Sequence, residues 1–276
     1  TPAVNFLNLM QRERINAIIP IKEFEEDKYL IGVTKFGIIK KTSLSNFDTN
    51  RKAGLIAINL KPGDELVGIK QTSGTDNVII VTKNGKCICF SEDDVRPMGR
   101  ISGGVRAIKL EEDDEVVAME LVQPDEQLLV VTKNGYGKRT PVTDYKIQVR
   151  GGKGLLTYDK AKFKKTGELV GAMVVSDDDE VLLINSDGII IRIKSSEVSK
   201  LGRATQGVKI MRVAEDCEII SIAKVIKEDE ELEAAEFGSC GPDEDGKKAA
   251  SGKDAEEDAD PDQITLGEFE PETSEE

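Results

Sequence analysis

The sequence predicts an all-β protein built from a repeated unit of about four strands. One set of glycines follows apolar, β-branched runs at intervals of 48 to 53 residues; it comprises Gly37, Gly85, Gly135 and Gly188. A second set keeps nearly the same interval; it comprises Gly54, Gly104, Gly154 and Gly207. No segment with helical periodicity separates the apolar runs, so we expect strands throughout each repeat.

The first half of each repeat is predicted to form a β-hairpin. Its first apolar runs, each ending at the turn glycine, are Tyr29–Gly37, Val78–Gly85, Leu128–Gly135 and Val181–Gly188. Three of the turns contain Asn-Gly or Asp-Gly, dipeptides that accept the positive φ angles of two-residue hairpin turns. We therefore expect two-residue turns at Asn84-Gly85, Asn134-Gly135 and Asp187-Gly188.

The second half of each repeat is predicted to supply a third and a fourth strand. In the second repeat these strands are Gly104–Leu110 and Glu115–Leu121, joined by the acidic turn Glu111–Asp114. Residues 3–22 match only this second half, so we expect half a repeat followed by four whole repeats. Thr1 is expected to be an internal position of a longer chain, because neither an initiator Met nor a signal peptide precedes the pattern.

Repeats of four strands at this length are typical of a radial arrangement, a β-propeller or a relative of it. The absence of Trp and His excludes the WD40 signature. A linear β-solenoid is the alternative, although its coils are usually shorter.

Charge divides the sequence into two parts. Residues 228–276 contain 20 acidic and 3 basic residues, whereas residues 1–227 contain 32 acidic and 35 basic residues. The acidic part has too little apolar surface to offset the entropy of ordering, so we predict a folded domain at 1–227 and a disordered tail at 228–276.

Composition excludes several kinds of activity. The chain has no histidine, which excludes Ser-His-Asp and Cys-His catalysis and a mixed zinc site. Its four cysteines are too few and scattered for a disulfide framework, which favours a reducing cytoplasm. No apolar run of 18 or more residues is present to span a membrane. The paired carboxylates lie at predicted turns, so we expect no catalytic residue, metal site or cofactor in this chain.

The loops between the second and third strands carry the strongest functional signal. They cover residues 43–54, 95–104, 145–154 and 198–207, and each contains at least two cations and ends on glycine. Glycine lets backbone N–H groups approach a phosphate, and Arg and Lys donate charge-assisted hydrogen bonds to it. In any single loop, solvated cations and a structural glycine are the commoner explanation.

Four such loops at equivalent positions of a radial array predict a curved basic track. The track lacks a ladder of aromatic side chains, which favours duplex DNA over single strands. The predicted DNA-binding residues are Lys40, Lys41, Arg51, Lys52, Arg96, Arg100, Arg106, Lys138, Arg139, Gln148, Arg150, Gly151, Gly152, Lys153, Gly154, Arg192, Lys194, Lys200, Arg203 and Lys209.

The sequence resembles the C-terminal domain family of DNA gyrase A proteins. The resemblance covers residues 1–227 and is carried by Val95–Arg100, Lys133–Thr140, Gly202–Gly207 and the heptad at 148–154. The family's box reads Gln, basic, Arg, Gly, Gly, Lys, Gly, and the heptad departs from it only at Val149.

This resemblance implies a six-bladed β-pinwheel, a propeller-like disc with four-stranded blades. Its rim is expected to wrap duplex DNA with positive handedness, so that the parent enzyme introduces negative supercoils with ATP. The family's principal box usually lies in the first blade, which here is expected upstream of Thr1, so the heptad is a later copy.

The resemblance also places the cleavage tyrosine, the ATPase site and Mg²⁺ elsewhere in the parent enzyme. The implied partners are double-stranded DNA, the rest of the gyrase A protein and the gyrase B protein. Two copies of each protein are expected in an A2B2 complex, in the bacterial cytoplasm at the nucleoid. The corresponding domain of topoisomerase IV and a protein-interaction propeller are the alternatives.

Overall fold

The computed structural model describes residues 15–49 and 54–225. The chain divides into two units, residues 1–227 and 228–276, and all described residues belong to the first. The predicted disorder of the acidic tail therefore falls outside the described residues. Of the predicted half repeat at residues 3–22, only residues 15–22 are described, and contrary to expectation they form no strand.

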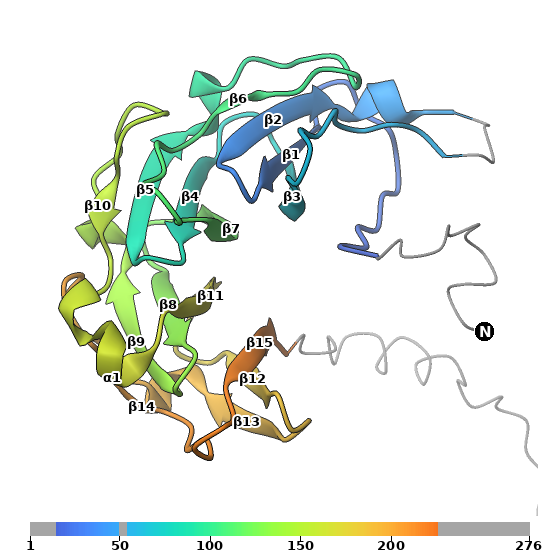
Figure 1. The fold of residues 1–276 in the computed structure, drawn as a ribbon. Coiled ribbons are helices and arrows are strands. Elements are labelled where there is room, and N and C mark those ends of the chain that lie inside the picture. The colour runs from blue at the N-terminus through green and yellow to red at the C-terminus, as the bar shows by residue number, and fades with distance from the viewer. Residues whose placement is uncertain (1–14, 50–53, 226–276) are drawn as a thin grey trace, which may run out of the picture. The chain divides into compact units, whose positions relative to one another are not determined.

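The described residues form four antiparallel sheets, shown in Figure 1, which confirms the all-β prediction. The first sheet contains, in order, β3 (Leu66–Thr72), β1 (Tyr29–Thr34), β2 (Ile38–Ser43) and β6 (Val105–Arg106). The second contains β7 (Val116–Val122), β4 (Asn77–Thr82), β5 (Lys86–Ser91) and β10 (Leu155–Leu156). The third contains β11 (Leu169–Val175), β8 (Gln127–Thr132), β9 (Tyr136–Pro141) and β14 (Val208–Lys209). The fourth contains β15 (Ile219–Lys224), β12 (Glu180–Asn185) and β13 (Ile190–Lys194).

Helical segments are short. A 3-10 turn follows the second strand of each repeat; these turns are η2 (Leu44–Phe47), η3 (Glu92–Asp94), η4 (Val142–Asp144) and η6 (Ser195–Glu197). The third repeat adds η5 (Lys160–Lys162) and α1 (Phe163–Thr166) between its third and fourth strands. None of the helices in the described ranges has the length and apolar character needed to cross a bilayer.

The third strand of each repeat joins the sheet of the preceding repeat. By sequence β6 belongs to the second repeat, yet it pairs with β2 of the first, with Ile38 opposite Arg106 and Ile39 opposite Val105. β10 and β14 pair in the same way with β5 and β9. The predicted strand Gly104–Leu110 is therefore correctly located but shorter than expected, and each four-stranded sheet combines two successive repeats.

The hairpin turns are three residues long, whereas the sequence predicted two. In the second repeat the Gly85 N–H donates to the Thr82 carbonyl at 3.0 Å, and Val81 lies opposite Cys87. Gly85 has a φ of 79°, but Asn84 has no positive φ. A two-residue type I′ turn needs positive φ at both central residues, so the dipeptide here marks a type I turn closed by a left-handed glycine.

The core lies between successive sheets. In β4, Val78 and Ile80 pack with residues of the first sheet, while Ile79 and Val81 pack with residues of the third. Both faces of the strand are therefore covered, which explains its uninterrupted apolar sequence. Burying each such side chain contributes roughly 1.5 to 3 kcal/mol. In β12, by contrast, buried and half-buried residues alternate.

Each sheet has two distinct edges. The strands β3, β7, β11 and β15 form the inner edges, where neighbours contact one another in chain order. The strands β6, β10, β14 and β13 form the outer edges (Figure 1). We call the pairing of each third strand with the sheet of the preceding repeat strand exchange. Since the basic loops lead directly into β6, β10 and β14, strand exchange places these loops at the outer edges.

Candidate nucleic-acid interface

Three basic loops lie along the second strand of the preceding repeat. They are residues 95–104, 145–154 and 198–207. The Gln148 N–H donates to the Cys89 carbonyl of β5 at 2.7 Å. Equivalent bonds of 2.8 Å run from Met98 to Lys41 and from Leu201 to Arg139. The remaining loop, 43–54, includes residues 50–53, which lie outside the described residues.

Backbone hydrogen bonds also join each of these three loops to the segment that follows the preceding loop. The N–H of Lys109 donates to the Gly152 carbonyl at 2.8 Å. Equivalent bonds of 3.3 Å run from Asn59 to Ser102 and from Asp159 to Thr205. In every case the donor lies five residues after the end of one loop, and the acceptor lies in the next loop along the chain. The outer edges therefore carry a connected series of loops.

The glycines that close the loops have a structural role. Gly104 has a φ of 80°, and a Cβ there would lie 2.6 Å from the Ile39 carbonyl oxygen. Gly207 has the same geometry: its φ is 75°, and a Cβ there would lie 2.6 Å from the Gly137 carbonyl oxygen. Glycine thus allows the third strand to approach the preceding sheet, which accounts for its constant spacing in the sequence.

The heptad at 148–154 is held in place by its own arginine. Arg150 donates from Nη1 to the Arg106 carbonyl at 2.6 Å and from Nε to the Asp94 carbonyl at 3.1 Å. The Gly151 N–H donates to the Ala107 carbonyl at 2.7 Å. Lys153 is the exposed cation of the heptad. The two heptad cations that match the family's box therefore have different roles: Arg150 fixes the loop, and Lys153 faces solvent.

Two other predicted heptad residues contribute mainly backbone. Gly152 accepts the loop-to-loop bond described above, and Gly154 precedes β10 with a φ of 71°. The Gln148 side chain points inward: its Nε2 is buried and has no hydrogen-bond partner among the residues that the structure describes.

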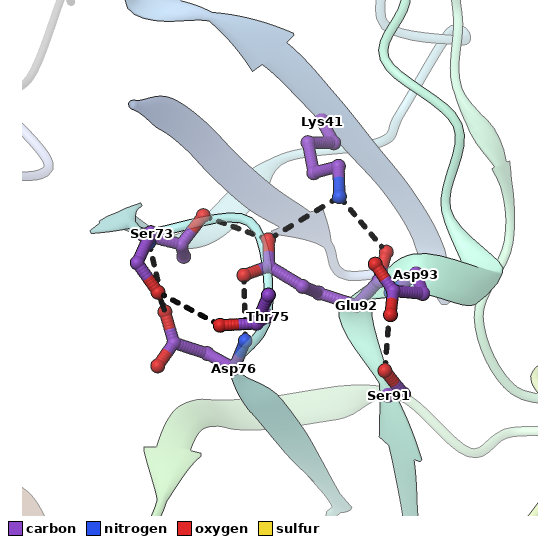
Figure 2. Close-up of polar contacts among 8 residues, drawn as sticks. Lys41, Ser73, Thr75, Asp76, Ser91, Glu92 and Asp93 are labelled. Atoms are coloured by element: carbon purple, nitrogen blue, oxygen red, sulfur yellow. Dashed lines mark hydrogen bonds and ion pairs between the residues drawn. The ribbon is translucent and has the colours of Figure 1, made fainter. Parts of the chain in front are cut away.

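Lys41 and Arg139 are buried, which contradicts their predicted position on an exposed track. Lys41 lies 3.5 Å from the Glu92 carboxylate and donates to the Glu92 carbonyl at 3.2 Å (Figure 2). Glu92 also accepts bonds from Thr72 and Asp76. Arg139 donates to the Val198 carbonyl at 2.8 Å and pairs with Asp177. A charge buried this way needs such partners to offset its desolvation, so both cations are committed to contacts inside the protein and do not face solvent.

Lys40 and Lys138 are likewise buried and hold loops instead of facing solvent. Lys138 is fully buried and donates to the Gly202 carbonyl at 2.7 Å, to the Arg203 carbonyl and to Thr205 Oγ1 at 3.1 Å. Lys40 donates to the carbonyls of Ala57, at 2.6 Å, and Arg100. The second repeat has Ile88 at the equivalent position. There Arg150 supplies the anchoring donors that the strand lacks.

The remaining predicted cations lie on the surface or near it. Five are exposed and form no ion pair with other described residues; they are Arg96, Arg106, Lys153, Lys194 and Lys209. Arg100 and Arg203 are half-buried. Two more are exposed but paired, Arg192 with Glu180 and Lys200 with Asp177. Arg51 and Lys52 lie outside the described residues. Each of the four outer edges thus presents at least one available cation.

The described residues offer no metal-binding cluster of His, Cys, Asp or Glu. Burial raises the pKa of the Cys89 thiol to about 11, so this side chain stays protonated at neutral pH. It behaves as a small apolar residue of the core.

A family model, sequence relatives and solved structures all indicate the same protein family. The family model described as "DNA gyrase C-terminal domain, beta-propeller" matches residues 28–73, 76–123, 126–176 and 179–236. These four matches correspond to the four whole repeats found in the sequence.

Sequence relatives are DNA gyrase A proteins. The protein from Clostridium acetobutylicum is 56% identical over 86% of this chain and 28% of its own length. The proteins from Mycolicibacterium smegmatis and Salmonella typhimurium are 45% and 42% identical over 83% and 94% of this chain and 27% and 30% of their own lengths. The chain thus spans less than a third of these relatives.

Two solved structures share the fold. The C-terminal domain of a DNA topoisomerase IV gives a TM-score of 0.79 at 30% identity, covering 84% of this chain and 73% of that one. A DNA gyrase A C-terminal domain gives a TM-score of 0.73 at 31% identity, covering 82% and 75%. From the fold, the four matched repeats and the sequence relatives together, the chain belongs to the family of DNA gyrase A C-terminal domains.

Proposed function

We propose that this domain binds duplex DNA along its outer edges and wraps it, so that a parent gyrase can introduce negative supercoils with ATP. The observation that carries the proposal is the series of hydrogen-bonded loops, with an available cation at each outer edge. Duplex DNA presents phosphates on both strands along its whole length, so cations repeated along a surface can each neutralise one.

Wrapping follows from the distribution of these cations. Bending a duplex through tens of degrees costs several kcal/mol, and contacts spread along the path are needed to offset that cost. The backbones of these loops are also held by hydrogen bonds from Lys40, Lys138 and Arg150, so mainly side-chain freedom is lost when the loop cations bind.

Catalysis is assigned to the rest of the parent enzyme. We propose that ATP, Mg²⁺ and the cleavage tyrosine belong to regions other than this chain, in an assembly of two gyrase A and two gyrase B proteins in the bacterial cytoplasm. A topoisomerase IV parent is the second candidate, because a C-terminal domain of that enzyme has the TM-score of 0.79. Supercoiling by the reconstituted parent enzyme favours gyrase, and relaxation without supercoiling favours topoisomerase IV.

A protein-binding role is supported by one separate observation. Ile101 and Val149, in two of the same loops, are 73% and 79% exposed. Apolar side chains at loop tips suit a protein partner better than phosphates.

A salt titration of DNA binding tests the proposal. We expect duplex affinity to fall steeply with salt, with a log–log slope of about 0.9 per phosphate contact, so that the five available cations named above contribute about 4.5. Absence of duplex binding at low salt would leave the protein-binding role as the better explanation.

A further inference from the structure

A turn in the third repeat carries four exposed lysines that the loop pattern does not include. They are Lys160, Lys162, Lys164 and Lys165, on η5 and α1, and we call residues 160–165 the basic turn. The equivalent turns of the second and fourth repeats, Glu111–Asp114 and Ala214–Cys217, are acidic and shorter. The third repeat thus reverses the charge at this position.

The basic turn lies between two of the basic loops. It follows β10, which is the continuation of loop 145–154, and the N–H of Asp159, just before it, donates to the Thr205 carbonyl of loop 198–207. The Nζ atoms of Lys165 and of Lys209 on β14 both lie 5.6 Å from the centroid of the Tyr136 ring. Figure 1 shows α1 beside the outer edges, between β10 and β14.

The backbone of the turn is held by local contacts and by the β8–β9 hairpin turn. Phe163 stacks on Tyr158, with 5.8 Å between ring centroids and 25° between planes. Asp159 Oδ1 accepts the Ala161 N–H at 3.1 Å, and Asn134 Nδ2 donates to the Lys165 carbonyl at 2.9 Å. An anchored backbone means that only side-chain freedom is lost when the lysines bind a polyanion.

Three of the lysines, Lys162, Lys164 and Lys165, have no acidic partner within the described part of the chain, and Lys165 lies over the Tyr136 ring. Lys160 lies 3.5 Å from Glu111, which also pairs with Lys86. Lys162 and Lys164 are exposed and form no ion pair with any described residue. Their charges are therefore available to a ligand.

We propose that the basic turn is an additional binding site for the phosphodiester backbone of duplex DNA, bridging loops 145–154 and 198–207. The inference rests on the proposed function, since it extends the same DNA path across the space between two loops. The preceding junction, between loops 95–104 and 145–154, carries the acidic turn Glu111–Asp114 and lacks this site. DNA is therefore held more tightly from the second to the third outer edge than from the first to the second.

Paired substitutions in the 276-residue chain test the inference. The variant Lys162→Gln/Lys164→Gln removes two charges that make no ion pair with described residues. The control Lys70→Gln/Lys224→Gln removes the same charge from β3 and β15, on the inner edges. Both are compared with the unmodified chain by duplex affinity over a salt series and by nuclease footprinting, and thermal unfolding establishes that each is folded.

We expect the turn variant to lower the log–log salt slope by about 1 to 2, since each lost phosphate contact removes about 0.9, and to shorten the footprint. Lys162→Arg/Lys164→Arg is expected to restore both, and the control to change neither. Wild-type slope and footprint in the turn variant contradict the inference while leaving DNA binding intact. Failure of the unmodified chain to bind duplex contradicts the proposed function itself.

Discussion

Lys138 shows how one side chain ties two repeats together. It extends from β9, and its ammonium group donates to three groups of the loop that the next repeat lays across that strand. Sequence periodicity places this lysine beside the predicted track, which is why it was expected to bind DNA. Lys138 is buried because loop 198–207 of the next repeat covers it. The local sequence of β9 does not show that this loop will lie there. For the same reason the burial of Lys40, Lys41 and Arg139 could not be predicted from their local sequence.

Replacing Lys138 should change how stability depends on pH. Burial lowers the pKa of Lys138 from 10.5 to about 8; the nearby Arg203 lowers it too, while Cys87, Asp144 and Asp159 oppose this. A lysine that binds its proton more weakly when folded makes the unfolding free energy increase as pH rises from about 8 to 10.5. We expect the difference in unfolding free energy between the unmodified chain and Lys138→Met to grow by about 1 to 3 kcal/mol over that range. Chemical denaturation across the range measures it, and a pH-independent difference contradicts the assignment.

The two cations of the heptad should separate into different roles. Lys153→Gln is expected to weaken duplex binding and lower the salt slope by about 0.9, because it removes one phosphate contact. Arg150→Lys retains the charge but lacks the planar fork that reaches two carbonyls. We therefore expect faster amide hydrogen exchange at Gly151 and Lys109 in Arg150→Lys and unchanged exchange in Lys153→Gln. Weaker duplex binding in Arg150→Lys, with wild-type binding in Lys153→Gln, would indicate that Arg150 and not Lys153 contacts DNA.

At the scale of the elements, the sequence locates strands well but not their partners. Apolar runs and turn glycines identified the hairpins, since both are local properties. The exchange of β6, β10 and β14 was not foreseen, because each observed strand has only two residues and its partner belongs to another repeat. The repeated loop pattern gives no signal for the basic turn, because this turn occurs in a single repeat.

Strand exchange makes the closing glycines sensitive to substitution. Gly104→Ala combines a strained φ of 80° with a Cβ 2.6 Å from the Ile39 oxygen, and we expect it to lower the unfolding free energy by roughly 2 to 4 kcal/mol. Gly188→Ala is the matched control, with a φ of 79° and no atom within 4 Å, so only about 1 to 2 kcal/mol is expected. Denaturant unfolding of both variants gives the comparison. Equal losses would mean that the close approach of the third strand is unimportant.

At the scale of the whole molecule, function depends on repetition more than on any one motif. The loops share one geometry, the backbone hydrogen bonds link them in series, and the available cations are spread over four outer edges. The heptad that most resembles the family's box is one contact among several. Its loss is expected to shorten the bound path without abolishing binding, since the other outer edges keep their cations.

The most direct test of this account is a topoisomer assay with the 276-residue chain. The protein is bound to relaxed circular DNA, the complex is treated with a topoisomerase that relaxes free supercoils, and the DNA is analysed after the protein is removed. Wrapping with positive handedness predicts positively supercoiled topoisomers, whose number rises with the amount of protein bound. An unchanged relaxed distribution, under conditions where binding is complete, would contradict wrapping. It would mean that the outer edges bind DNA without wrapping it.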